Sequence, residues 1–169
     1  MPRKNVLVKL SSDVYRLDSV HNWIERQSQT YFVVALIGGG TQINEALVAA
    51  DKSVGNFGPL GRELVGLPER QIARDQLELN EAEFQDLLAE RGIHIGAVIK
   101  PAMDIGGVLC HQNGDIYVLN AYLSYDIIYV LTLDKRKKEK EAYYERLGNA
   151  LGGRLKKIHV IGVPSNFKD

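Results

Sequence analysis

Long apolar runs separated by amphipathic segments make up most of this sequence. Residues 5–10, 31–37 and 126–133 are rich in Val, Ile and Leu, and the last two runs are apolar at successive positions. Strands that helices cover on both faces, as in a parallel sheet, show such continuous runs. We therefore predict strands at these three places, and further strands at residues 93–99 and 157–163.

The segments between these runs have helical patterns. In residues 17–27 and 41–50 the apolar positions recur every three or four residues on one face, and residues 135–151 are mostly charged residues of high helix propensity. Strands that alternate with helices form doubly wound sheets with right-handed crossovers. The predicted fold is therefore an α/β, three-layer αβα sandwich whose mostly parallel sheet has at least four strands.

Two segments in the middle of the chain have patterns of their own. Residues 51–68 are rich in glycine and proline, which predicts an irregular and mobile loop. Asn80 and Glu83 have the spacing of a capping box, which predicts a helix that begins there and continues to Arg91 before Gly92.

Composition indicates a single globular unit. The chain has 169 residues, 45% of them hydrophobic and 25% charged, and its 21 basic residues balance 21 acidic ones. No overall charge therefore attracts nucleic acid or an anionic membrane, and no stretch approaches the ~20 apolar residues of a membrane span. Because Cys110 is the single cysteine, no intrachain disulfide can form. We predict one cytoplasmic domain, residues 1–169, without a nucleic-acid or membrane partner.

Three consecutive glycines between a predicted strand and a helix are the best candidate for ligand binding. Gly38, Gly39 and Gly40 would expose backbone N–H groups at a helix N-terminus, where the helix dipole favours an anion. Alternatively, they form a tight turn that needs a positive φ. Lys9 ends the first strand and would face the crevice at the carboxyl ends of the strands, unless it extends to solvent from an edge strand.

The order of these features resembles the amino acid kinase family, which includes the acetylglutamate, aspartate, uridylate and carbamate kinases. A strand ending near Lys9, a helix, and a second strand ending in residues 38–40 are similar to the start of a family kinase. Residues 113–115, Asn-Gly-Asp, followed by an apolar stretch and the strand at residues 128–134, are similar to the family's Asn-x-Asp, helix and nucleotide-side strand.

This resemblance implies phosphoryl transfer from ATP, with Mg²⁺, to a small-molecule acceptor, in a protein that forms homo-oligomers. It implies catalytic roles for Lys9 and Asp115, and acceptor binding by Arg62 and Asn113. No set of protein side chains that would hold a metal is predicted. Phosphate or nucleotide binding is implied for Gly38, Gly39, Gly40, Thr132, Asp134, Lys135 and Lys138.

Several alternatives stay open at this point. The family's glycines after its first lysine are replaced by Ser11 and Ser12, and the chain is short for a family kinase, so it could be a catalytically inactive member that senses a ligand or binds partners. A dinucleotide-binding domain is a weaker alternative, because the third glycine of that fingerprint is missing.

Two of the candidate sites also have purely structural interpretations. Asn-Gly at residues 113–114 is a strong hairpin signal and could join strands at residues 108–111 and 116–119. The basic run at residues 135–140 could be a solvated helical face.

Overall fold

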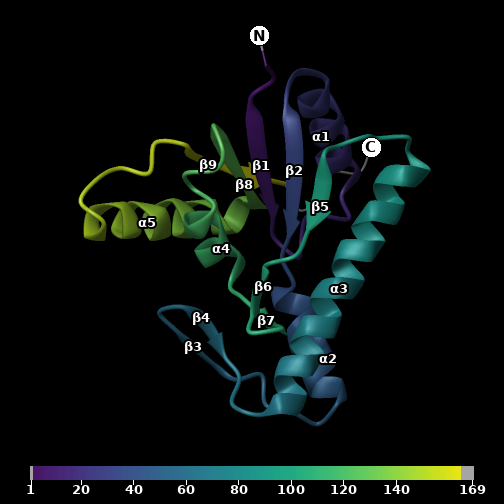
Figure 1. The fold of residues 1–169 in the computed structure, drawn as a ribbon, viewed down its shortest axis with the longest axis vertical. Coiled ribbons are helices and arrows are strands. Elements are labelled where there is room, and N and C mark those ends of the chain that lie inside the picture. Colours follow the sequence, from purple (N-terminus) through teal and green to yellow (C-terminus); the bar gives the residue numbers. More distant parts are fainter. Residues whose placement is uncertain (1, 165–169) are drawn as a thin grey trace.

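The computed structural model describes residues 2–164 and contains a central five-stranded parallel sheet (Figure 1). Its strands are β1 (Asn5–Leu10), β2 (Phe32–Ile37), β5 (Ala97–Ile99), β8 (Ile127–Leu133) and β9 (Ile158–Val163). Their order across the sheet is β5-β2-β1-β8-β9, and each neighbouring pair is parallel. The prediction of a parallel sheet with at least four strands is confirmed.

Five helices and two small antiparallel hairpins complete the part of the chain that the structure describes. The helices are α1 (Asp18–Thr30), α2 (Gly40–Ala49), α3 (Leu67–Glu90), α4 (Gly114–Asn120) and α5 (Asp134–Ala150). The hairpins are β3 (Asn56–Gly58) with β4 (Gly61–Glu63), and β6 (Ala102–Ile105) with β7 (Val108–His111). Within residues 2–164 no helix is long and apolar enough to cross a membrane.

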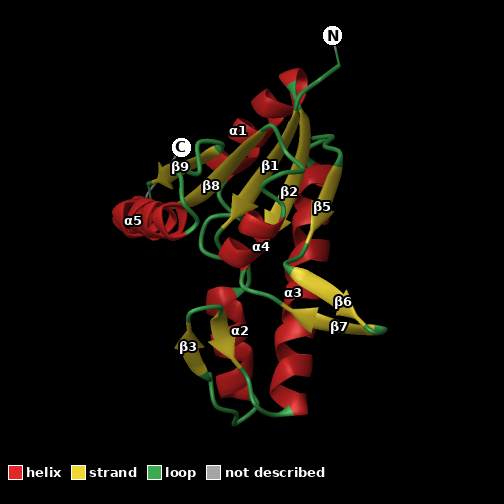
Figure 2. Cartoon of the chain, turned by 60° about the vertical axis from the view of Figure 1, so that its left-hand side comes forward, coloured by secondary structure: helices red, strands yellow, loops and turns green. Residues whose placement is uncertain are grey.

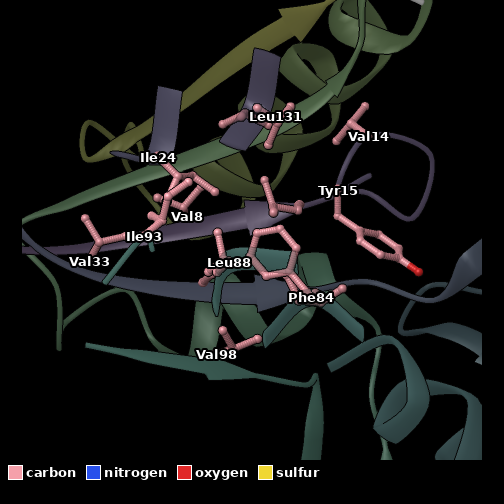
Figure 3. Packing of buried hydrophobic residues seen from close by; sticks show 14 of the residues in the cluster. Val8, Val14, Tyr15, Ile24, Val33, Phe84, Leu88, Ile93, Val98 and Leu131 are labelled. Carbon is pink, nitrogen blue, oxygen red and sulfur yellow. The ribbon is translucent and has the colours of Figure 1, made fainter. Parts of the chain in front are cut away.

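Side chains that alternate along β1 enter two different cores, as the strand period of two requires. Val8 packs with residues of α1 and α3, among them Ile24, Phe84 and Leu88 (Figure 3). Leu7 instead belongs to the cluster that α4 and α5 cover. Helices therefore cover both faces of the sheet, and the predicted three-layer αβα sandwich is confirmed.

A smaller third core lies beyond the carboxyl ends of the strands. Helix α2, the first half of α3 and the hairpin β3-β4 extend away from the sheet there (Figures 1 and 2). Ile43 and Leu47 of α2 pack against Leu64, Ala73 and Leu77, and all five side chains are buried. This extension stands directly beside the edge of the sheet where ligands bind in folds of this type.

The path of the chain also defines a switch point in the sheet. From β1 the chain moves outward through β2 to β5, then returns to the other side of β1 to form β8 and β9. In open α/β sheets the crevice for ligands lies at the carboxyl ends of the strands where the order reverses. That position here is next to the end of β1.

Of the predictions for the middle of the chain, one is wrong and two are only partly right. Asn80 does not start a helix, because α3 runs continuously from Leu67 to Glu90. The 51–68 segment is not entirely irregular, since it forms the hairpin β3-β4. The strand predicted at residues 93–99 is confined to Ala97–Ile99. Local patterns cannot locate such boundaries when a long helix and a short edge strand depend on tertiary packing.

The Asn113-Gly114 ambiguity is resolved in favour of a helix. The Asn113 side chain accepts hydrogen bonds from the Asp115 and Ile116 amides, so Asn113 is the N-cap of α4. Strand β7 (Val108–His111) does form a hairpin, but its partner is the preceding β6 and not residues 116–119. The alternative hairpin through Asn113-Gly114 is therefore wrong.

Candidate functional site

A cavity of about 160 Å³ lies at the carboxyl ends of β1 and β2, at the switch point of the sheet. The glycine turn after β2, the start of α4 and one face of α5 form its walls, and the hairpin β3-β4 contributes Phe57 and Arg62. Of the candidate residues, Lys9, Gly38, Gly39, Gly40, Arg62, Asn113 and Asp115 line this cavity. We call it the anion cleft, for the reasons that follow.

Residues 38–40 form the glycine turn, and its first two glycines are required for close packing and not for a left-handed backbone. None of the three glycines has a positive φ, so the interpretation as a turn that requires one is wrong. A Cβ on Gly38 would lie 3.1 Å from the Leu10 carbonyl oxygen, and one on Gly39 would lie 2.8 Å from a Leu77 methyl group. At Gly40 the nearest atom would be 3.8 Å away, which is an ordinary contact. The cleft side of Gly40 is therefore open.

The loop after β1 is tied to the N-terminus of α2. The Ser12 hydroxyl accepts a hydrogen bond from the Thr41 amide at 3.2 Å, and the Gln42 side chain donates to the Ser12 carbonyl at 3.0 Å. The Thr41 hydroxyl donates to Asp13 at 2.6 Å. Ser12 therefore accepts a hydrogen bond from one of the helix-terminal N–H groups that an anion would otherwise use.

Asn80 fixes the glycine turn from the opposite side. It is completely buried in the middle of α3, and its side-chain amide donates to the Gly38 carbonyl at 3.1 Å. Gln76, one turn earlier, donates to the Asn80 side-chain oxygen at 2.8 Å. The sequence pattern that suggested a helix cap thus belongs to a buried amide that holds the turn in place.

Lys9, Asp115, Lys140 and Tyr144 form a buried network at the floor of the cleft. Lys9 Nζ lies 3.4 Å from Asp115 Oδ1 and donates to the Ser11 hydroxyl at 3.3 Å. Asp115 also accepts a hydrogen bond from Lys140, and another from the Tyr144 hydroxyl at 2.8 Å. Two ammonium groups therefore share one carboxylate, which leaves a net positive charge in a site with little access to water.

The ionisation of this network favours an anion as a further partner. Burial by itself would raise the pKa of Asp115, but the charges of Lys9 and Lys140 and the hydrogen bonds outweigh burial and hold that pKa well below its usual range. Burial lowers the pKa of Lys9, and although the charge of Asp115 and its hydrogen bond act in the opposite direction, the charges of Lys140 and Arg136 add to the effect of burial. A bound anion would counter the effects of burial and of the neighbouring positive charges, because it would stabilise the charged form of Lys9.

Helix α5 presents one basic face to the cleft. Arg136 and Lys140 line the cavity, and Tyr144 continues the same i, i+4 series, which places the three on one side of a helix. Lys135 and Lys138 are exposed elsewhere on α5 and do not line the cavity. The i, i+4 spacing of Arg136, Lys140 and Tyr144 was available in the sequence and is the signal that would have selected them.

The other two nucleotide-side candidates also lie outside the cleft. Thr132 is completely buried in β8, and its hydroxyl oxygen has no hydrogen-bond partner among residues 2–164. Asp134, at the start of α5, is exposed and lies next to Gly162 of β9. Neither contributes to the cavity wall.

The hairpin β3-β4 brings a further cation to the cleft. Arg62 donates to the carbonyl oxygens of Val54 and Gly40, at 2.5 and 3.2 Å, and stacks on the ring of Phe57. Among residues 2–164 no carboxylate lies within ion-pair distance of its guanidinium group. Gly61, with φ +109°, lies against Asn113, where a Cβ would be 2.5 Å from the Asn113 Cβ. The hairpin is therefore held close to the start of α4.

His111 also lines the cleft and was not predicted as a site residue. Burial lowers its pKa, and the nearby Arg62 and Arg70 charges lower it further, although a hydrogen bond with the Arg62 backbone acts in the opposite direction. The ring is therefore neutral near neutral pH, and the positive charge of the cleft comes from lysine and arginine.

The donors of the cleft suit an oxyanion better than a metal ion. Within residues 2–164 no group of three or more His, Cys, Asp or Glu side chains is placed to hold a metal. The carboxylate at the cleft floor, Asp115, is already engaged by two lysines and a tyrosine. Since Mg²⁺ needs free oxygen ligands, these residues do not form a magnesium site of their own.

Comparisons with known proteins leave the chain without an assigned family. No protein-family profile and no curated protein matches it. Among solved structures, arginyl-tRNA synthetase from Plasmodium falciparum is similar to it with a TM-score of 0.49 and 12% identity. That alignment covers 96% of this chain and 43% of the synthetase, so the chain spans less than half the length of this neighbour.

Proposed function

We propose that this protein is amino acid kinase-like and binds a small molecule through a phosphate or carboxylate group in the anion cleft. The observation that carries the proposal is the convergence of four cations on one cavity, where Asp115 is the single acidic lining residue among residues 2–164. The four cations are Lys9, Arg62, Arg136 and Lys140. Arg136 makes two loose ion pairs, with Asp13 at 3.9 Å and with the exposed Glu139 at 3.7 Å. The uncompensated charge of the cleft therefore comes mainly from Arg62 and from the two lysines that share Asp115. A phosphate or carboxylate would supply the missing negative charge.

If the protein is a phosphotransferase that uses ATP, the same residues have definite roles. Lys9 and Lys140 would neutralise the oxygens of the phosphoryl group while its bond to the acceptor oxygen forms and its bond to ADP breaks. Asp115 would hold the two ammonium groups apart at a fixed spacing. Any Mg²⁺ would arrive with the nucleotide phosphates, because the cleft does not offer free carboxylate ligands.

The second candidate is a catalytically silent module that binds the anion as a sensor or as part of an assembly. Thr132, Asp134, Lys135 and Lys138, which the family resemblance assigns to the nucleotide, lie outside the cleft. A cavity of about 160 Å³ accommodates one anionic group but not a complete nucleotide. These two observations favour binding without transfer.

Calorimetric titration of the purified protein distinguishes these candidates. Saturable binding of inorganic phosphate that is weakened by Lys9→Ala supports the anion cleft. Saturable binding of Mg-ATP that is also weakened by Lys9→Ala supports the kinase candidate and justifies a search for the acceptor. If phosphate binds while millimolar Mg-ATP does not, the silent module is the better description.

A pair of glycine variants provides a matched control for the glycine turn. Gly40→Ala should fold normally, because its Cβ has room, yet the methyl group lines the cleft and should weaken phosphate binding. Gly92→Ala, which lies outside the cleft at a φ of +66°, should lower stability without changing phosphate affinity. If the folded wild-type protein binds neither inorganic phosphate nor acetate, the proposal is refuted.

A further inference from the structure

A second cavity adjoins the anion cleft on the side of α4. It has a volume of about 350 Å³ and lies between α4, the turn that follows it, and the hairpin β6-β7. Its lining residues are Ala102, Met103, Gln112, Tyr117, Asn120, Ala121, Ser124 and Tyr125. None of the eight is charged, in contrast to the anion cleft. We call this cavity the tyrosine pocket.

Gln112 connects the two cavities, because it is a lining residue of both. Its backbone N–H donates to the Pro101 carbonyl at 2.7 Å, which anchors it at the base of the hairpin β6-β7. Its side-chain oxygen is buried and has no hydrogen-bond partner among residues 2–164. A buried amide oxygen without a partner is costly, so the Gln112 side chain contributes little to stability in its present position.

The walls of the tyrosine pocket are suited to a planar, uncharged group. Tyr117 and Tyr125 pack against the core under α4, so the fold holds their rings in place. Burial raises the pKa of Tyr125, so its hydroxyl stays protonated and available as a donor. Met103 and two alanines add apolar surface, while Asn120 and Ser124 supply hydrogen bonds at the mouth. Aromatic rings and thioether sulfur both make favourable contacts with a ring.

Size explains why the ligand of the anion cleft would extend into this pocket. At about 160 Å³ the cleft holds the anionic group and little more, so the rest of the ligand must leave it. The open groove between α5 and β9 is larger, at about 530 Å³, but it shares no lining residue with the cleft. The tyrosine pocket does share one, Gln112.

From this arrangement we infer that the ligand of the anion cleft is an organic anion whose other end is an uncharged aromatic or heteroaromatic ring bound in the tyrosine pocket. The inference rests on the proposed function, since it assigns the substrate class of the same site. Gln112 contacts the middle of the ligand and determines which linker lengths fit.

A homologous series of phosphate monoesters tests this directly. Binding of methyl, phenyl, benzyl and phenethyl phosphate to the wild-type protein is measured by calorimetry. One of the three ring-bearing esters should bind about tenfold more tightly than methyl phosphate. The linker length with the highest affinity measures the separation of the two cavities.

Two substitutions identify where the ring binds. Ser124→Trp should fill the mouth of the tyrosine pocket and abolish the gain from the ring, leaving methyl phosphate affinity unchanged. Leu123→Trp is the matched control, because Leu123 is 88% exposed and does not line the pocket, so the gain should persist. Gln112→Met should leave the melting temperature equal or higher, yet reduce the gain from the ring.

The outcomes separate this inference from the proposed function. If methyl phosphate binds but a ring adds nothing at any linker length, or if the gain survives Ser124→Trp, the tyrosine pocket is not the ring site and the proposed function stands. If inorganic phosphate, acetate and all of the esters fail to bind, both are wrong.

Discussion

The two faces of strand β1 carry different kinds of side chain and have different roles in the molecule. Toward α1 and α3 it places Val6, Val8 and Leu10, which are all completely buried in an apolar core. Toward α4 and α5 it places Leu7 and then Lys9, whose ammonium group is buried beside Asp115. One side therefore stabilises the sheet by apolar burial, and the other carries charge into it at the end where a ligand would bind. Stability and binding should accordingly respond to different substitutions.

The largest expected effect on stability is on the apolar side. Phe84→Ala removes a completely buried ring that contacts Tyr15 edge-to-face, and should lower the free energy of unfolding by about 3–5 kcal/mol. The phosphate affinity of the protein that remains folded should not change. Urea unfolding and calorimetry measure the two effects. A weaker phosphate affinity in folded Phe84→Ala would contradict the independence of the two sides.

A slightly smaller loss is expected at the charged side, and it should depend on pH. Asp115→Asn leaves Lys9 and Lys140 without their shared carboxylate, which should cost about 3 kcal/mol of unfolding free energy at neutral pH. Because the pKa of Asp115 is lower in the folded than in the unfolded protein, the wild type retains this stabilisation above the ordinary carboxyl range. It loses this stabilisation progressively as the pH falls from about 4 toward the much lower folded pKa of Asp115, so the difference between the two proteins should narrow steadily over that range.

Phosphate provides a second test of the Asp115→Asn variant. A bound phosphate can replace the missing carboxylate, so it should raise the melting temperature of Asp115→Asn more than that of the wild type. Equal shifts in the two proteins would mean that the anion does not contact Lys9 and Lys140. Chloride at equal ionic strength is the control for general screening.

The smallest of these effects concerns the support of the glycine turn. Asn80→Ala removes the hydrogen bond to the Gly38 carbonyl and leaves that carbonyl without this donor, which should cost about 1–2 kcal/mol. It should also weaken phosphate binding, because the turn is no longer held from α3. Gln76→Ala, which removes only the neighbouring bond to Asn80, is the control and should have a smaller effect in both measurements.

Most of the sheet could be predicted from the sequence, because its signals are local. The runs at β2 and β8 are apolar at successive positions, as expected for strands buried on both faces, and the run at β1 is rich in Val and Leu. The glycine turn could also be recognised, because its three glycines follow the apolar run of β2 directly. The short edge strand β5 and the continuous α3 were not, since their limits depend on contacts with distant segments.

The site was predictable only in part. Lys9 and Gly38 to Gly40 stand at the ends of strands, and parallel strands bring their carboxyl ends to one edge, so their proximity follows from the fold class. The residues of the basic run that face the cleft could not be predicted in this way, and Lys135 and Lys138 were the wrong choice. The direction of each side chain depends on how α5 is rotated against the sheet. Arg136 and Lys140 face the cleft, and the other two face solvent.

The sequence by itself therefore determined strands β1, β2, β8 and β9, helices α1, α2 and α5, and the turn at the switch point, because hydrophobic periodicity and glycine act over a few residues. Tertiary structure alone decided that Lys9 meets Asp115, 106 residues later, and that Asn80 supports Gly38 from the middle of a helix. Those contacts join elements that are far apart in the chain. Their geometry depends on how the helices pack across the sheet, which no local pattern encodes.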